Sequence, residues 1–366
     1  MLDYKDLYIV HVAPQLGGGV ASVIEQLARE QMRLGADVVV VRPSSSNVRF
    51  NSEGINVEEC PARLMPGGTM LFGVPYWKAP LGSSGSQATV VHYHGLAGQG
   101  CLGRNRFPSV CTLHGVSALA NLSPARAHIV RMGFLRRTEF IAVDPVTAEY
   151  FSKYCPSHIE VIPNGLPSLS DSVEMGHCEV PVITFVGNMD ELKGYRYALD
   201  AARLLNASGL EFKMLFAGPA SKEELSYFED FRNQNALQEC VKYLGVVKDA
   251  GTVLIPKSDV VLLPSRTEGF PMSLLEGLRA GKALLATRVG GIPGLLKNAE
   301  NGFFVERDGG DIADKASRLL SNSELLRSFS AKSRKLYEDG FRIEDVCERY
   351  RDAYSRAFDF FEEQLR

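Results

Sequence analysis

The chain has 366 residues, of which 45% are hydrophobic and 23% charged, and a formal net charge of −3. A chain of this length is too long to fold around one ordinary hydrophobic core, which predicts two domains of roughly 150 to 200 residues. The nearly neutral net charge does not favour nucleic acid as a partner. No apolar stretch approaches the ~20 residues that span a bilayer. The seven cysteines are scattered and form no C-x-x-C pair, which indicates reduced thiols in a cytosol rather than disulfides or a zinc site.

The first half of the chain alternates short apolar runs with helical stretches. The start, MLDYKDLYIVHVAP, contains a first strand rather than a signal peptide. Such alternation predicts parallel βαβ units in a doubly wound sheet. We expect a helix at 20–34 and strands at 7–10, 38–41, 90–92, 109–113 and 140–143, with an irregular Gly/Pro/Ser-rich region at 61–85.

One long segment of this half contains no acidic residue. Between Glu59 and Glu139 there is no Asp or Glu, although eight Lys and Arg residues occur there. These cations are either solvated surface residues or a cationic face. Residues 125–140 mix four arginines with apolar residues, as in a basic amphipathic helix on an anionic membrane surface. No series of aromatic residues accompanies them, so anionic lipid or a lipid diphosphate fits better than nucleic acid.

A polar segment after Asn164-Gly165 is expected to link the domains, and a second alternating set follows it. We expect an N-terminal domain at 1–165 and a C-terminal domain at 178–342. A helix at 343–366 is expected to pack back on the N-terminal domain. In the second set we expect strands at 182–186, 212–217, 241–244, 260–263 and 284–287, and helices at 195–208 and 222–234.

Glycines follow the first strand and open the first helix. Gly17, Gly18 and Gly19 allow backbone N–H groups to approach a phosphate or sugar closely. The pattern is similar to a dinucleotide fingerprint, but Asp37, an acid about 20 residues on, precedes the second strand instead of ending it. We therefore do not expect NAD.

Three histidines follow strands, namely His92 and His94 on one and His114 on the next. Three interpretations stay open: a metal site, hydrogen-bonded core histidines, or side chains that bind a sugar. No carboxylate or cysteine accompanies them nearby, which disfavours the metal. In the second half, Lys193 lies in a loop after a strand. It is either a solvated lysine or a charge that neutralises a diphosphate leaving group.

The segment PSRTEGFPMSLLEGLRAGKALLATRVGG carries two glutamates, Glu268 and Glu276, with seven residues between them. Pro271 is expected at the start of a helix that Gly281 ends. Glu268 then precedes the helix, and Glu276 lies about a turn inside it. A glycosidase pair would flank the bond from opposite sides, whereas these two acids approach from one side. We expect them to bind hydroxyl groups beside a helix N-terminus that favours phosphate.

Together these segments resemble the retaining glycosyltransferases of family 4. The resemblance rests on the E-x7-E segment, the FVG…KG loop, Phe216–Gly218, Tyr243–Gly245, the PNG turn and the N-terminal glycine loop. It covers nearly the whole chain and is strongest over residues 182–305. It implies a GT-B fold, an α/β architecture of two Rossmann-like domains that face a central cleft.

The resemblance also implies roles for individual residues. His114, Glu268 and Lys193 would be catalytic: His114 contacts the donor sugar, Glu268 lies near that sugar, and Lys193 pairs with the diphosphate. The expected substrate-binding residues are Gly18, Gly19, His94, Asn188, Arg266, Gly269, Phe270, Pro271, Glu276 and Val246. Among them Glu276 would bind the ribose and Val246 would lie near the base. No metal and no cofactor are expected, because the nucleotide-sugar, linked to UDP or GDP, is a substrate.

Two positions depart from the family pattern. Asn188 stands where the family usually carries an arginine, which removes half of the cationic pair on the diphosphate, and Arg266 is the candidate to replace it. Gly294 stands where the family commonly carries an acid after its GG-x-P segment.

We expect a metal-independent enzyme that transfers a sugar with retention to a glycan or lipid-linked acceptor, in assembly of surface polysaccharide such as lipopolysaccharide. It would be cytoplasmic, with peripheral contact to the inner face of the cell membrane. Two alternatives stay open. A scaffold protein on a weakened transferase fold is motivated by Asn188, and a sugar-nucleotide epimerase would need no acceptor.

Overall fold

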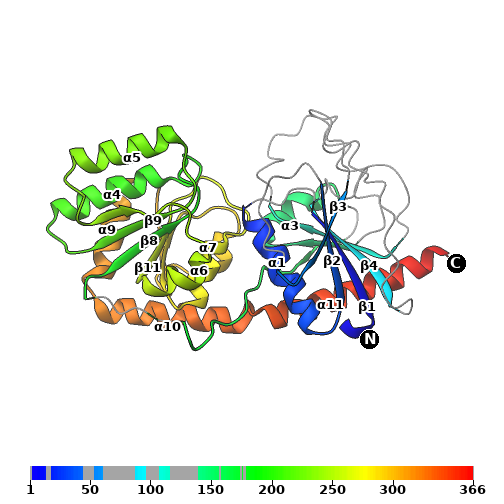
Figure 1. The fold of residues 1–366 in the computed structure, drawn as a ribbon. Coiled ribbons are helices and arrows are strands. Elements are labelled where there is room, and N and C mark those ends of the chain that lie inside the picture. Colours follow the sequence, from blue (N-terminus) through cyan, green and yellow to red (C-terminus); the bar gives the residue numbers. More distant parts are fainter. Residues whose placement is uncertain are drawn as a thin grey trace. The chain divides into compact units, whose positions relative to one another are not determined.

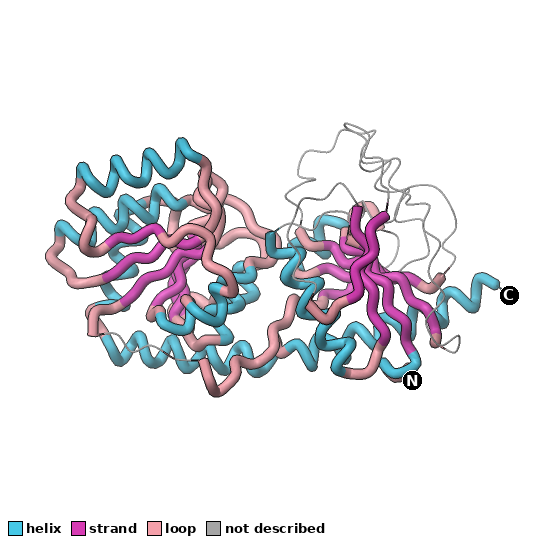
Figure 2. The backbone as a smooth tube through the Cα atoms, in the orientation of Figure 1, coloured by secondary structure: helices cyan, strands magenta, loops and turns pink. Residues whose placement is uncertain are grey.

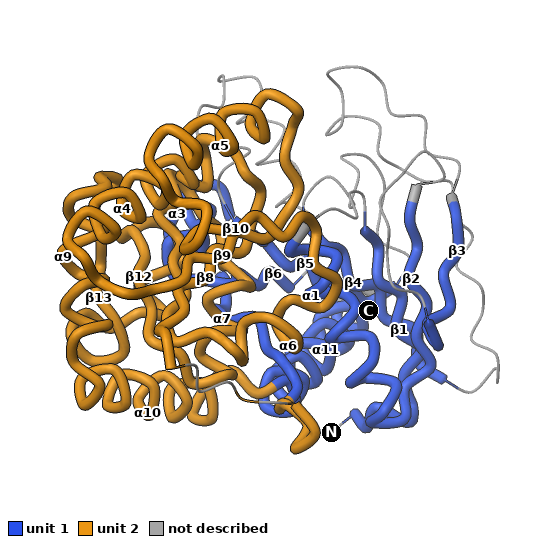
Figure 3. Tube along the Cα trace, turned by 60° about the vertical axis from the view of Figure 1, so that its left-hand side comes forward, with its two compact units in different colours: residues 1–167, 343–366 blue, residues 168–342 orange. Residues whose placement is uncertain are grey.

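The computed structural model describes residues 2–13, 18–43, 53–60, 87–95, 107–115, 139–155, 158–173, 175 and 179–365 (Figure 1). The chain divides into two compact units (Figure 3). Unit 1 comprises Met1–Pro167 and Ile343–Arg366, and unit 2 comprises Ser168–Arg342. Each unit is an α/β structure around its own parallel sheet (Figure 2). That the two sheets face one cleft stays a prediction.

Unit 1 contains a seven-stranded sheet in the order β3-β2-β1-β4-β5-β6-β7, with all neighbouring strands parallel. The expected strands and first helix are confirmed, and β3, β7 and α3 are additions. The elements are η1 (Tyr4–Asp6), β1 (Leu7–Val12), α1 (Gly18–Arg33), β2 (Asp37–Pro43), β3 (Asn56–Cys60), β4 (Ala88–His94), β5 (Ser109–Leu113), β6 (Glu139–Ala142), α3 (Pro145–Ser152), β7 (Glu160–Val161) and α11 (Ile343–Leu365).

The two faces of this sheet bury different side chains, because successive residues of a strand point to opposite sides. Cys111 and Leu113 of β5 pack with Phe151 of α3 in an apolar cluster. Thr112, which lies between them in the strand, is hydrogen-bonded to Tyr350 of α11. Helix α11 therefore covers the face opposite to α3, and it contacts α1 on that face.

The chain re-enters unit 1 at a tight contact. The amide of Ile343, the first residue of α11, donates to the carbonyl of Leu166 at 3.0 Å. A Cβ on Gly165 would lie 2.9 Å from a methyl of Val346. The glycine of the PNG turn thus lets α11 approach the end of the N-terminal segment.

Unit 2 contains a six-stranded sheet in the order β10-β9-β8-β11-β12-β13, again with parallel neighbours. Its expected strands and helices are confirmed, and Pro271 directly precedes α7. The elements are β8 (Val182–Val186), α4 (Tyr195–Ala207), β9 (Lys213–Ala217), α5 (Lys222–Gln234), β10 (Val241–Tyr243), α6 (Ala250–Val253), η3 (Ile255–Lys257), β11 (Val260–Leu263), α7 (Met272–Arg279), β12 (Ala283–Ala286), α8 (Ile292–Leu295), β13 (Gly302–Phe304), α9 (Gly309–Leu320) and α10 (Ser323–Gly340).

Strands β11 and β12 of unit 2 are buried on both faces, so they are continuous apolar runs rather than alternating ones. Every residue of β11 and of β12 is buried. Gly277 of α7 lies 3.0 Å, measured from a built Cβ, from side chains of Val261 and Leu284. This small residue brings α7, the helix that carries Glu276, close to β11 and β12.

Candidate functional site

In both sheets the strand order reverses at one place, between β1 and β4 in unit 1 and between β8 and β11 in unit 2. Ligands of doubly wound sheets bind at such a switch point, beyond the carboxyl ends of the strands. The predicted residues gather there in each unit. Gly18 and Gly19 follow β1, His94 ends β4, Lys193 follows β8, and Glu268 follows β11.

The centre of the unit 2 site is an ion pair between Lys193 and Glu268. The Lys193 Nζ lies 2.6 Å from Oε1 of Glu268, and the hydroxyl of Ser265 donates to the same oxygen at 2.6 Å. The Glu268 side chain is 6% exposed and the Lys193 side chain is 28% exposed. The carboxylate is therefore nearly buried, whereas the lysine side chain is partly exposed.

Glycines bring the two loops of this ion pair together. A Cβ on Gly194, whose φ is +74°, would lie 2.2 Å from the carbonyl oxygen of Pro264. Likewise, a Cβ on Gly290 would lie 1.9 Å from the carbonyl oxygen of Glu268, and the amide of Gly291 donates to the carbonyl of Gly269 at 2.7 Å. The KG and GG segments thus hold the loop that carries Glu268 on both sides.

Arg266 and Asn188 lie at the exposed border of this site. The backbone amide of Arg266 donates to the carbonyl of Leu192 at 2.7 Å, which joins its loop to the one that carries Lys193. Asn188 begins that second loop directly after β8. Arg266 is therefore a positive charge in a loop that is hydrogen-bonded to the Lys193 loop. In the Lys193 loop itself, Asn188 stands at the position where an arginine is expected.

Glu276 lies inside α7 and has partners different from those of Glu268. Its carboxyl group lies against the backbone of Gly251, because a Cβ on Gly251 would lie 2.4 Å from Cδ of Glu276. Burial raises the pKa of Glu276 to about 7; Arg279 opposes that rise and Asp249 adds to it. Arg279 itself donates to the carbonyl of Gly251 at 2.8 Å. Near neutral pH this carboxyl group can either donate or accept a hydrogen bond.

The remaining predicted residues of unit 2 lie around α7 and β10. Pro271 precedes α7 and provides no side-chain cap, so the first amides of the helix are not capped by it. The ring of Phe270 lies 6.0 Å from that of Phe341. Val246 is 73% exposed in the loop after β10, an apolar surface that a nucleotide base could cover.

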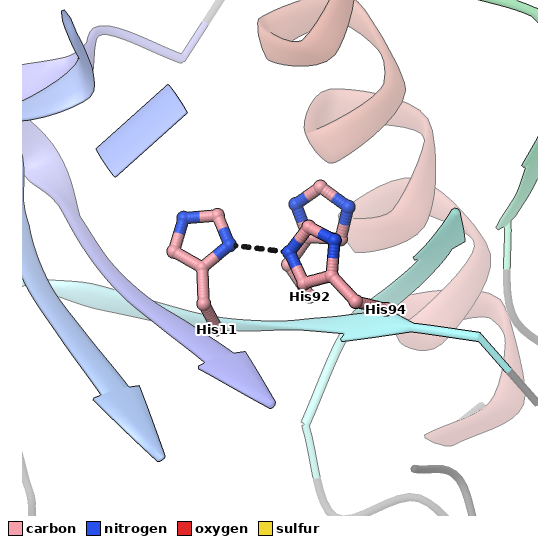
Figure 4. A group of neighbouring side chains, drawn as sticks. All are labelled: His11, His92 and His94. Carbon is pink, nitrogen blue, oxygen red and sulfur yellow. Dashed lines mark hydrogen bonds between the residues drawn. The ribbon is translucent and has the colours of Figure 1, made fainter. Parts of the chain in front are cut away.

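In unit 1, His114 and His94 join a buried hydrogen-bonded network that includes a third and a fourth histidine. His94 Nδ1 lies 3.0 Å from Nε2 of His114, and its Nε2 lies 2.9 Å from Nδ1 of His11 (Figure 4). His92 packs against His94 with ring centroids 4.3 Å apart. Burial lowers the pKa of His114 and of His11 to about 4, and it holds the pKa of His92 and of His94 well below the ordinary value of 6.5. All four rings are neutral at pH 7.

Sequence reasoning missed His11 and the partners of this network. His11 is directly opposite His92 in the parallel register, so both point to the face covered by α1 and α11. Gln31 of α1 and Tyr354 of α11 complete the network from that face. The spacing of two residues between His92 and His94 indicates a shared face, but the register with His11 is not visible in the sequence.

Three of these histidines also have the arrangement of a candidate cation site. His11, His92 and His94 each offer a ring nitrogen, and the three nitrogens lie within 4.8 Å of one another. Both nitrogens of each ring already have a hydrogen-bond partner. A metal ion would have to displace several of these bonds, so the geometry fits hydrogen-bonded core histidines better.

Two expectations for unit 1 lie largely or wholly outside the described residues. The basic helix expected at 125–140 is one of them, since only its last two residues are described, and the irregular region at 61–85 is the other. Within the described part of the chain, no helix is both long enough and apolar enough to cross a membrane.

Comparison with known proteins agrees with this architecture. Residues 17–168 match the model of Glycosyltransferase Family 4, and residues 177–336 match that of Glycosyl transferases group 1. An N-acetyl-alpha-D-glucosaminyl L-malate synthase of Bacillus anthracis is 25% identical over 68% of this chain and 68% of its own. A UDP-Gal:alpha-D-GlcNAc-diphosphoundecaprenol alpha-1,3-galactosyltransferase of Escherichia coli is 26% identical over 54% of each chain.

Solved structures show the same fold. A sucrose-phosphate synthase of Thermosynechococcus elongatus superposes with a TM-score of 0.79 at 17% identity, covering 96% of this chain and 99% of the other. HepE of Anabaena, crystallised with UDP-glucose, gives a TM-score of 0.74 at 16% identity, covering 95% and 99%. The fold is that of the GT-B glycosyltransferases. Both matching family models describe glycosyltransferases, one in each unit, so the protein is a glycosyltransferase of the family 4, GT-B type.

Proposed function

We propose that the protein transfers a sugar from a nucleotide-diphospho-sugar to a glycan or lipid-linked acceptor, with retention at the anomeric carbon. The observation that carries the proposal is the Lys193–Glu268 ion pair at the switch point of unit 2, beside the first turn of α7. The partly exposed Lys193 and the helix N-terminus both stabilise negative charge. Such charge develops on a diphosphate as the glycosidic bond breaks.

Each group around the ion pair has a role in this proposal. Glu276 binds the ribose hydroxyls, Val246 contacts the base, and Gly18 and Gly19 approach the diphosphate from unit 1. The backbone of Gly269 and Phe270 faces the sugar and phosphates. Arg266 supplies the second positive charge that Asn188 does not. With two cations and a helix N-terminus on the leaving group, the reaction needs no divalent metal, and we expect EDTA to leave kcat unchanged.

The names of two similar proteins support the choice of substrates. HepE was crystallised with UDP-glucose, and the Escherichia coli galactosyltransferase acts on a sugar linked to diphosphoundecaprenol. A lipid diphosphate acceptor also suits the acid-free segment between Glu59 and Glu139, which would contact an anionic membrane. We therefore place the reaction in cell-surface polysaccharide synthesis, at the cytoplasmic face.

The test measures nucleotide release from a panel of UDP- and GDP-sugars, for the wild type and for Glu276→Ala. Turnover by the wild type with one donor, and its loss in Glu276→Ala, would support the proposal. Donor isomerised without acceptor would indicate an epimerase, and no turnover with any donor and acceptor would indicate a scaffold. The anomeric configuration of the product, read from its proton coupling constant, tests retention, and sedimentation with anionic liposomes tests membrane contact.

A further inference from the structure

The histidine network of unit 1 is a continuous chain of hydrogen bonds that ends at His114. From His114 it runs through His94 and His11 to Gln31 of α1, then through Tyr354 of α11 to His92. His92 continues to Thr112 at 2.8 Å. His11, Gln31, His92 and Thr112 are fully buried and His94 nearly so, whereas His114 is half-buried.

The amide of Gln31 determines the direction of every bond from it to His114. Its Nε2 donates to the Tyr354 hydroxyl at 2.9 Å, so its Oε1 faces Nε2 of His11 at 2.7 Å. An amide oxygen only accepts, and a neutral imidazole has one N–H and one acceptor nitrogen. His11 therefore carries its proton on Nε2, and its Nδ1 accepts from Nε2 of His94. By the same argument, Nδ1 of His94 accepts from Nε2 of His114.

The other branch allows a consistent direction as well. The Tyr354 hydroxyl accepts from Gln31 and keeps its own proton, so it can donate to Nδ1 of His92. In that arrangement the His92 proton lies on Nε2 and is donated to Thr112. His11, His94 and His114 thus carry the proton on Nε2, and His92 is compatible with the same tautomer. If the Gln31 amide turned over, each bond from Gln31 to His114 would reverse and the protons of His11, His94 and His114 would move to Nδ1. The branch from Gln31 to His114 therefore has two self-consistent states, and one amide group selects between them.

Resting on the proposed function, we propose that Gln31 is a positioning residue that makes His114 present its Nδ1 to the ligand as a hydrogen-bond acceptor. Within the described part of the chain, Nδ1 of His114 has no hydrogen-bond partner. An acceptor nitrogen matches a hydroxyl group, which can donate. It does not match an ionised phosphate oxygen, which can only accept. The ligand group at His114 is therefore a sugar hydroxyl.

The direct test is NMR of protein labelled with ¹⁵N in histidine, since the two ring nitrogens of each tautomer have distinct shifts. Substitution of single histidines assigns the signals. We expect His11, His92, His94 and His114 to be neutral and protonated on Nε2 in the wild type at pH 7. A folded wild type in which His114 is protonated on Nδ1 would overturn the proposal.

Two substitutions of similar volume separate positioning from stability. Gln31→Met removes the amide, so we expect His114 to lose its single tautomer and kcat/KM to fall about three- to tenfold, as for one neutral hydrogen bond. Thr112→Val breaks the chain at the opposite end, beyond His92, and should leave the His114 tautomer unchanged. An unchanged His114 signal in folded Gln31→Met would contradict the proposal.

The NMR measurement needs no substrate, so it separates two kinds of failure. If no donor is turned over but His114 has the expected tautomer, the proposed function fails and the assignment of the network stands. If transfer occurs and His114 has the other tautomer, only the role of Gln31 fails.

Discussion

Gly251 and Glu276 lie so close together that residue 251 has no room for a side chain. A Cβ on Gly251 would lie 2.4 Å from Cδ of Glu276 and 2.6 Å from its Oε1. The position of the carboxyl group that we assign to the ribose thus depends on a glycine of α6, which lies outside the E-x7-E segment.

Gly251→Ala should displace the Glu276 carboxyl group and weaken donor binding about tenfold, or about 1.4 kcal/mol. Overpacking of this kind should also lower the free energy of unfolding by about 1–3 kcal/mol. Calorimetric titration with the nucleotide measures the affinity. Gly340→Ala is the control, because its Cβ would meet nothing within 4 Å in α10. Equal affinities of the two variants would contradict the role of Gly251.

The raised pKa of Glu276 predicts how stability depends on pH. The folded-state pKa of about 7 exceeds the ordinary value of 4.5, so the folded protein binds more protons between these pH values. The contribution of Glu276 to the stability of the fold is fully present below pH 4.5. The free energy of unfolding then falls as pH rises through 7. The loss amounts to about 2–3 kcal/mol.

Urea unfolding of the wild type and of Glu276→Gln at pH 5 and pH 8 measures this loss. Glutamine does not titrate, so the variant should lose less stability than the wild type over the same interval. Parallel losses in the two proteins would show that Glu276 has an ordinary pKa.

The Lys193–Glu268 pair should respond asymmetrically to substitution, because its two members differ in exposure. Lys193→Met leaves a buried carboxylate with the hydroxyl of Ser265, and we expect a loss of about 1–3 kcal/mol. Glu268→Gln leaves a lysine whose side chain is partly exposed, and should cost less than 1 kcal/mol. The double variant should cost less than the sum of the two. Equal costs for both single variants would argue against a difference in exposure between the two side chains.

Arg266 should carry part of the charge stabilisation that Asn188 does not provide. We expect Arg266→Met to lower kcat about tenfold to a hundredfold, or about 1.4–2.7 kcal/mol. Asn188→Arg in the same protein should restore part of the loss. Arg327→Met, at an exposed position of α10, is the control. If kcat is unchanged in Arg266→Met, Lys193 acts without a second cation.

The sequence predicted most strands of both sheets, because parallel strands buried on two faces are short apolar runs such as Val260–Leu263. The edge strand β3 was missed, since Asn56–Cys60 contains two glutamates and an asparagine. Helix α3 was also missed, although Asp144 caps it and Pro145 begins it.

The site was predicted residue by residue but not in its contacts. Lys193 and Glu268 were chosen separately, and their ion pair depends on Gly194 approaching Pro264 across two loops. The network of His11 and Gln31 depends on strand register and on the packing of α1. Both are relations between segments far apart in the chain, which one sequence does not reveal. The role of each predicted site residue stays a prediction.

The two segments of unit 1 have a consequence for the order of folding. Unit 2 is continuous, whereas unit 1 needs α11, which follows all of unit 2 in the chain. During synthesis, unit 2 can complete its core first. Tyr354 and Tyr350 meanwhile have yet to be added, so His92 and Thr112 lack their partners on one face of a sheet whose strands were made earlier. The domain that begins first on the ribosome is therefore the one that finishes last.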